Sequence, residues 1–192
     1  MTPARMLARM IAALALLGAI AAPAWADDIT NAMDQARKAY QAGDLGGAKQ
    51  SLDLASQLIG QKNAETFATL LPNALPGWKA EKVQTTALGA LGFGASTASR
   101  TYNNAKGDHV EVQITGDSAM VSQIATFLSN PAMAGAMGKL VRVGGQRAIQ
   151  DGDGNVKMIV ANKFLISVEG SADSASKLAY AQAIDFAKVS KM

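Results

Sequence analysis

The spacing of apolar residues changes once along this 192-residue chain, close to Trp78. Between residues 27 and 62 the apolar side chains recur every three or four positions, which is typical of amphipathic helices. After Trp78 they alternate with polar side chains, which is typical of strands with one buried face. The sequence therefore predicts an α+β fold, with a helical hairpin followed by a mostly antiparallel sheet. We expect helices packed on one face of that sheet, in the order strands, helix, strands, helix.

The predicted hairpin covers residues 27–62. Gly43 favours the end of a first helix, and Asp44 is a good cap for the second. Gly60 is expected to end the second helix. Helical spacing is shown by Ile29, Met33, Ala36 and Tyr40 in the first helix and by Ala48, Leu52, Ala55 and Ile59 in the second.

Residues 32–59 resemble a single tetratricopeptide unit. Small residues such as Ala36, Ala48 and Ala55 stand where two helices of such a unit pack closely, with Gly43-Asp44 at the turn. An array needs about three units to bury its own faces, and the sequence has no second copy. We therefore expect one hairpin docked on the rest of the chain.

Residues 63–77 form a predicted connector. Asn63 is placed to cap a short helix, Pro72 ends it, and Pro76-Gly77 favours a turn that leads into Trp78.

The predicted α+β domain spans residues 78–192. A first pair of strands is indicated at 96–102 and 110–114, and glycines bound a second group. A helix carrying Val121, Ile124 and Leu128 is expected between the two groups. A last helix, capped by Asp173 or Ser174, is expected to turn Leu178, Ala181, Ile184 and Ala187 inward. The second group of predicted strands is 140–143, 146–150, 156–160 and 164–168.

Residues 1–26 have the three parts of a cleavable secretory signal. Arg5 and Arg9 form the positive start, a run without polar side chains covers 11–22, and Ala24 and Ala26 are the small residues before the cut. The apolar run is shorter than the ~20 residues that span a bilayer. We expect cleavage after Ala26 and export to the periplasm.

Charge and cysteine content limit the classes of function. Removal of the signal leaves 16 basic and 15 acidic residues, without a basic cluster, so the sequence does not favour nucleic-acid binding. The chain has no cysteine, so burial rather than disulfides must stabilise it.

Ser118 is the only candidate nucleophile that the sequence singles out. The segment Gly116-Asp117-Ser118 resembles the nucleophile block of GDSL-type esterases. That family places its histidine near the C-terminus, whereas the single histidine here, His109, precedes the serine. The sequence therefore favours a helix cap at this position, with a hydrolase as the alternative.

Two further patterns suggest metals without completing a site. Asp151 to Asn155 resemble the start of a calcium loop, but Val156 stands where the glycine of an EF-hand belongs and Asn162 where its glutamate belongs. Met120, Met133 and Met137 have thioether sulfurs, which are soft ligands of the kind that binds copper. No cysteine or neighbouring histidine accompanies them in the sequence. We assign no metal, cofactor or catalytic residue, and keep a weak calcium or copper carrier as an alternative.

From Leu71 onward, the Leu-Pro-Gly-Trp entry and the glycine-bounded strands resemble exported bacterial proteins of unassigned function. The resemblance brings no site residues with it. Together these observations predict a non-enzymatic periplasmic binding or adaptor protein that holds an envelope protein or a small ligand. The contact surface is expected on the hairpin or on the open face of the sheet.

Overall fold

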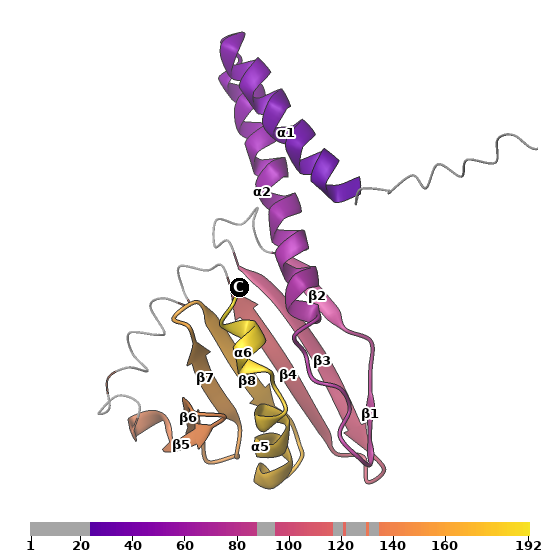
Figure 1. Ribbon diagram of the computed structural model, residues 1–192, viewed down its shortest axis with the longest axis vertical. Coiled ribbons are helices and arrows are strands. Elements are labelled where there is room, and N and C mark those ends of the chain that lie inside the picture. Colours follow the sequence, from indigo (N-terminus) through magenta and orange to yellow (C-terminus); the bar gives the residue numbers. More distant parts are fainter. Residues whose placement is uncertain (1–23, 88–94, 117–120, 122–129, 131–134) are drawn as a thin grey trace, which may run out of the picture.

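The computed structural model describes residues 24–87, 95–116, 121, 130 and 135–192. These include two N-terminal helices, an eight-stranded antiparallel sheet and further helices after it. The α+β prediction is confirmed (Figure 1). The first half holds α1 (Ala24–Gln41), α2 (Leu45–Ala68), β1 (Trp78–Ala80), β2 (Gln84–Ala87), β3 (Ser96–Asn104) and β4 (His109–Gly116). The second half holds β5 (Lys139–Val143), β6 (Gln146–Gln150), β7 (Val156–Val160), β8 (Phe164–Glu169), α5 (Ser174–Gln182) and α6 (Phe186–Val189).

The strands lie in the order β1-β3-β4-β8-β7-β6-β5, and every neighbouring pair is antiparallel. The short strands β1 and β2 both pair with β3, one at each end of it. Since β4 pairs with β8, the two groups of strands that the sequence separates form one continuous sheet (Figure 1).

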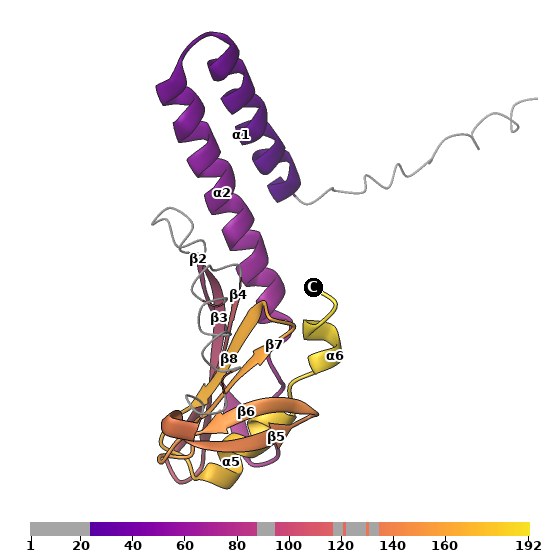
Figure 2. The ribbon, with the colours of Figure 1, turned by 90° about the vertical axis from the view of Figure 1, so that its left-hand side faces the viewer.

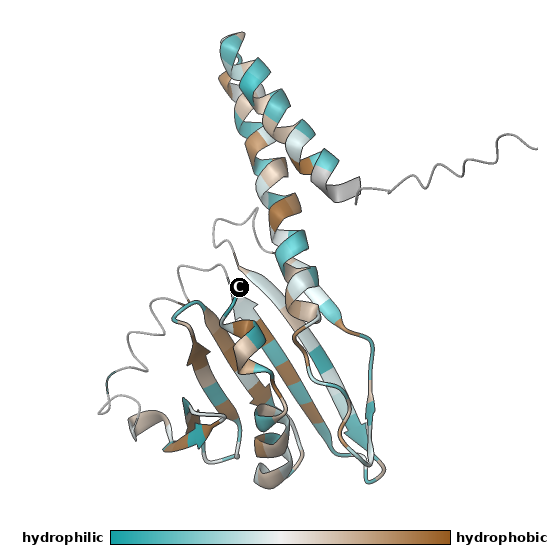
Figure 3. Ribbon diagram, viewed as in Figure 1, coloured by the Kyte–Doolittle hydropathy of each residue, from teal (hydrophilic) through white to brown (hydrophobic). Residues whose placement is uncertain are grey.

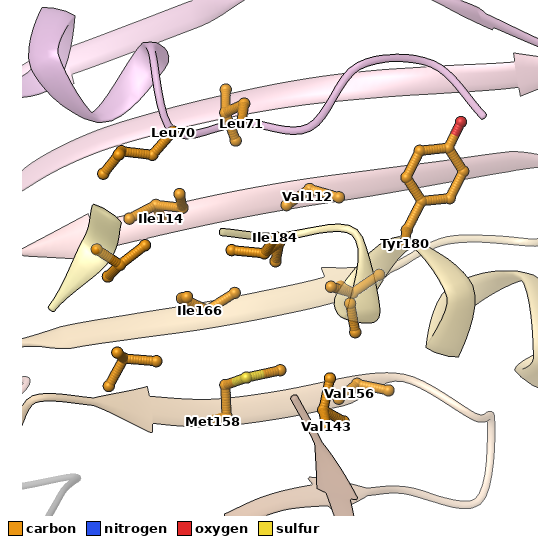
Figure 4. Close-up of a cluster of buried hydrophobic side chains, with 14 of the residues drawn as sticks. Leu70, Leu71, Val112, Ile114, Val143, Val156, Met158, Ile166, Tyr180 and Ile184 are labelled. Atoms are coloured by element: carbon orange, nitrogen blue, oxygen red, sulfur yellow. The ribbon is translucent and has the colours of Figure 1, made fainter. Parts of the chain in front are cut away.

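Alternate residues of the strands build the core on one face of the sheet. Ile114 on β4 pairs with Ile166 on β8, which pairs with Met158 on β7, and all three side chains are buried. The helices α5 and α6 and the segment 69–77 cover this face, and Leu70, Tyr180 and Ile184 belong to the same cluster (Figure 4). This burial of apolar surface is the main stabilising term for a chain without disulfides.

Local turn chemistry places several elements where the sequence predicts them. Gly144 and Gly145 have positive φ angles and link β5 to β6, as expected for a two-residue hairpin loop. Asn162 also has a positive φ in the tight turn between β7 and β8. Asp173 caps α5, since its carboxylate accepts the backbone N–H of Ser176 at 2.7 Å.

The last helix differs from the prediction because the chain forms two helices there. Asp185 caps α6, so the helical phase is broken after Gln182. As a result Ala181 and Ile184 are buried as expected, but Ala187 is exposed and Val189 is buried in its place.

The second helix of the hairpin also differs, because α2 continues through Gly60 to Ala68. No separate helix starts at Asn63. The Gly60 carbonyl accepts the Ser96 hydroxyl at 3.0 Å, and a Cβ at Gly60 would lie 3.2 Å from that of Ala87. Gly60 therefore serves close packing of α2 on β2 and β3, which offsets the ~1 kcal/mol that glycine costs in a helix.

No helix in the described part of the chain combines the length and apolarity that crossing a membrane requires.

Candidate interaction surface

The hairpin of α1 and α2 extends away from the sheet (Figures 1 and 2). Its turn forms as the sequence predicts: Gly43 has a φ of +78°, and the Asp44 carboxylate accepts the N–H of Gly47 at 2.8 Å. The helix α1 packs along α2, and the end of α2 packs on β2 and β3. One continuous helix therefore connects the projecting tip to the sheet.

Small side chains form the contact between α1 and α2. Ala32 and Ala36 on α1 and Ala48 and Ala55 on α2 are buried, whereas the larger apolar residues expected to share their faces are not. Tyr40 is 68% exposed, and Met33 is also exposed. The helical spacing is thus as predicted, but alanines lie at the centre of the contact and the large side chains lie beside it.

Five of the six large apolar side chains that are exposed on α1 and α2 repeat every seven residues, and Leu54 is the exception. Met33 and Tyr40 have this spacing on α1, and Leu45, Leu52 and Ile59 have it on α2. We call these five residues the hairpin stripe.

The stripe lies on one side of the hairpin. At about 100° per residue, its members lie about 20–60° to the same rotational side of Ala36 on α1 and of Ala48 on α2. Because α1 and α2 run in opposite directions, these two flanks face the same way. Apolar residues are visible along both helices in Figure 3, well beyond the sheet.

Ion pairs border the stripe on both helices. Arg37 lies 3.1 Å from the Asp34 carboxylate, and Lys49 lies 2.7 Å from that of Asp53. Each pair is formed within one helix, so the border of the stripe carries little net charge. Such exposed pairs contribute ~0.3–0.5 kcal/mol each to the helices.

The Asp151–Asn155 turn holds a lysine ammonium where the sequence suggests a cation. The Lys177 side chain is only 2% exposed, and its Nζ donates to the Asp153 carbonyl and to Asn155 Oδ1, both at 2.8 Å. Asp151 in turn accepts the backbone N–H groups of Asp153 and Asn155. Burial acts to raise the pKa of the Asp151 carboxyl, but hydrogen bonds from Asn155 and Asp153 outweigh it and lower that pKa.

A serine and a histidine that the sequence analysis did not connect lie side by side. Ser171 Oγ is 2.9 Å from His109 Nδ1, and it also accepts the backbone N–H of His109 at 3.0 Å. His109 is exposed at the start of β4, where buried residues alternate with exposed or half-buried ones. In the part of the chain that the structure describes, no carboxylate bonds to this ring, so the pair ties β4 to the loop before α5.

The remaining sequence candidates give no site within the described residues. Ser118, Met120 and Met133 lie outside the described ranges, and Met137 is exposed. Within residues 24–87, 95–116 and 135–192, no three His, Cys, Asp or Glu side chains come together as metal ligands would.

A shallow hollow of about 410 Å³ lies between α2 and β2. Its lining is mixed: Gln61, Ala64, Glu65, Thr85, Thr86 and Ala87. Glu65 lies 3.8 Å from Lys62, so its carboxylate is already paired.

Comparison with protein-family models, with curated proteins and with solved structures found no significant match to this chain.

Proposed function

We propose that this chain is a non-enzymatic binding or adaptor protein of the bacterial periplasm that contacts a protein partner through its hairpin. The hairpin stripe is the single observation that carries the proposal. Leu45 is 66% exposed and Leu52 is 56% exposed, although their seven-residue spacing is that of residues that pack between helices. Large apolar side chains gathered on one side of a projecting element mark an interaction surface.

The construction of the hairpin supports a rigid docking element. Its inner contact is made of alanines, so two helices of limited length bury little apolar area against each other. A helical pair of this kind gains stability when a partner buries its exposed apolar side. The anchoring of α2 on β2 and β3 holds the tip of the hairpin beyond the sheet (Figure 1).

The proposed periplasmic localisation rests on the signal-like pattern of residues 1–26. We expect osmotic shock to release a chain whose N-terminal residue is Asp27, as read by N-terminal sequencing. A chain that keeps residues 1–26, or that stays in the cytoplasmic fraction, would contradict this localisation.

A photoreactive amino acid at Leu52 tests the docking role in intact cells. We expect a discrete cross-linked product, identified by mass spectrometry, that disappears when Leu45→Glu is added. The matched control carries the same photoreactive residue at Gln50, which is exposed on the same helix but lies outside the stripe. Equal products from both positions, or none from Leu52, would overturn the proposal.

A further inference from the structure

We infer that the partner seated on the hairpin stripe is a second copy of this chain, so that two hairpins form an antiparallel four-helix bundle. The inference rests on the proposed role of the hairpin as a docking surface. It names the occupant of that surface, and three properties of the stripe lead to it.

The first property is symmetry. Leu45, Leu52 and Ile59 lie seven residues apart, with Leu52 at the centre. A two-fold axis at Leu52 sets Leu45 of one copy opposite Ile59 of the other, and Leu52 opposite its own equivalent. A self-complementary patch of this kind is what a symmetric dimer requires. The seven-residue repeat is also the spacing at which helices pack in bundles.

The second property is area. The five stripe residues together leave about 500 Å² exposed on each chain, taking a large side chain at roughly 150–250 Å². A standard stable interface buries ~800 Å² on each partner, so the stripe supplies more than half of that area. Neighbouring small residues and the aliphatic stems of Arg37 and Lys49 extend the same surface.

The third property is charge. The stripe contains no ionised side chain, and the Asp34–Arg37 and Lys49–Asp53 pairs border it on α1 and α2. A second copy therefore brings no excess of like charge toward the first. An apolar centre with a neutral, polar border is the usual arrangement of a protein interface.

The oligomeric state of the purified, secreted chain tests the inference. We expect sedimentation equilibrium to give twice the chain mass at micromolar concentration. Leu52→Glu places two carboxylates at the two-fold axis and is expected to raise the dissociation constant by about 100-fold or more. The matched control, Gln50→Glu, adds the same charge outside the stripe and should leave the dimer unchanged. Circular dichroism establishes that each variant is folded.

A second variant avoids the risk of disrupting the helix. Because the chain has no cysteine, Leu52→Cys introduces a single thiol on the expected axis. Mild oxidation is expected to give a disulfide-linked dimer, whereas Gln50→Cys gives none. A monomeric wild type and no disulfide from Leu52→Cys would overturn self-pairing. A cross-link from Leu52 to a different protein in cells would then leave the docking role standing.

Discussion

The ring of Phe67 near the end of α2 packs edge to face on the ring of Phe164 at the start of β8. The two centroids are 5.5 Å apart and the planes meet at 84°. Gly116 at the end of β4 leaves room for both rings, since a Cβ there would come within 2.8 Å of each. This contact joins the helix that carries the stripe to two strands of the sheet.

Replacing Phe67 with alanine is expected to remove this anchor. Phe67 is buried, so Phe67→Ala should lower the free energy of unfolding by about 3–5 kcal/mol through lost contacts and a cavity. Leu54→Ala is the control, since Leu54 lies on the same helix but is exposed, and it should change stability by less than ~0.5 kcal/mol. Urea unfolding followed by circular dichroism measures both. Similar losses in the two variants would contradict the anchoring role of Phe67.

A second prediction concerns the loop that follows β8. Gly170 has a φ of +137°, and a Cβ there would overlap the carbonyl oxygen of His109. Gly107 has a φ of +89° with nothing within 4 Å of its Cβ position. Gly107→Ala should therefore cost only the ~1–2 kcal/mol of a left-handed backbone.

Gly170→Ala should cost more than this control, because the added methyl group displaces the backbone and breaks the Ser171–His109 contact. Thermal unfolding gives the difference in stability. Loss of the hydrogen bond is expected to change the chemical shifts of the His109 ring in NMR spectra. Equal stability of the two alanine variants would show that the loop tolerates the added methyl group.

The sequence predicts a structural feature well when the residues that cause it lie close together in the chain. The β5–β6 turn follows from Gly144-Gly145 alone, and the α5 cap follows from Asp173, because the necessary chemistry lies within a few residues. The exposure of Leu52 does not follow, since periodicity shows which residues share a face but not whether anything covers it. The burial of Lys177 was missed because its acceptors, Asp153 and Asn155, lie more than twenty residues away.

The helix boundary at residue 60 was wrong for a similar reason. A glycine in an amphipathic segment favours a helix end when judged by local propensity. Here the partner that requires a small residue is Ala87, on a strand distant in the sequence. The Ser171–His109 contact, which joins residues 62 positions apart, gives no signal in the sequence at all.

Alkaline pH should destabilise the fold through Tyr102. Burial raises the pKa of its phenol from 10.0 to about 12, and its hydroxyl donates to the Pro72 carbonyl at 2.6 Å. The folded state thus favours the neutral phenol. The raised pKa of Tyr102 contributes about 2–3 kcal/mol to the free energy of unfolding. This contribution is complete below pH 10 and is lost as the pH rises toward 12.

Tyr102→Phe should lower stability at pH 8 by about 1–2 kcal/mol, because it leaves the Pro72 carbonyl without its donor. The variant should also lose stability less steeply than the wild type above pH 10. Denaturant unfolding at several pH values measures both chains. A slope in Tyr102→Phe equal to that of the wild type would refute the assignment to Tyr102.

Lys177 on α5 should stabilise the Asp151–Asn155 turn, which links β6 to β7. Lys177→Ala removes both charge-assisted hydrogen bonds and the buried stem, so we expect a loss of about 3 kcal/mol or more. Lys177→Met keeps most of the stem and should lose less. Thermal unfolding distinguishes the variants, and an unchanged midpoint in Lys177→Ala would show that the turn does not need the ammonium.

The same geometry predicts how the protein responds to calcium. Asp153 and Asn155 direct oxygens at the Lys177 ammonium, and the Asp151 carboxylate is used by backbone N–H groups, so a cation would have to displace a charge that is already bound. Weak extracellular calcium sites have dissociation constants of about 0.1–1 mM. Calcium at ten times that range should therefore leave the unfolding midpoint of the wild type unchanged, since only a ligand that binds the folded state raises it. A rise with calcium but not with magnesium, retained in Lys177→Met and lost in Asp151→Asn, would instead establish the turn as a calcium site.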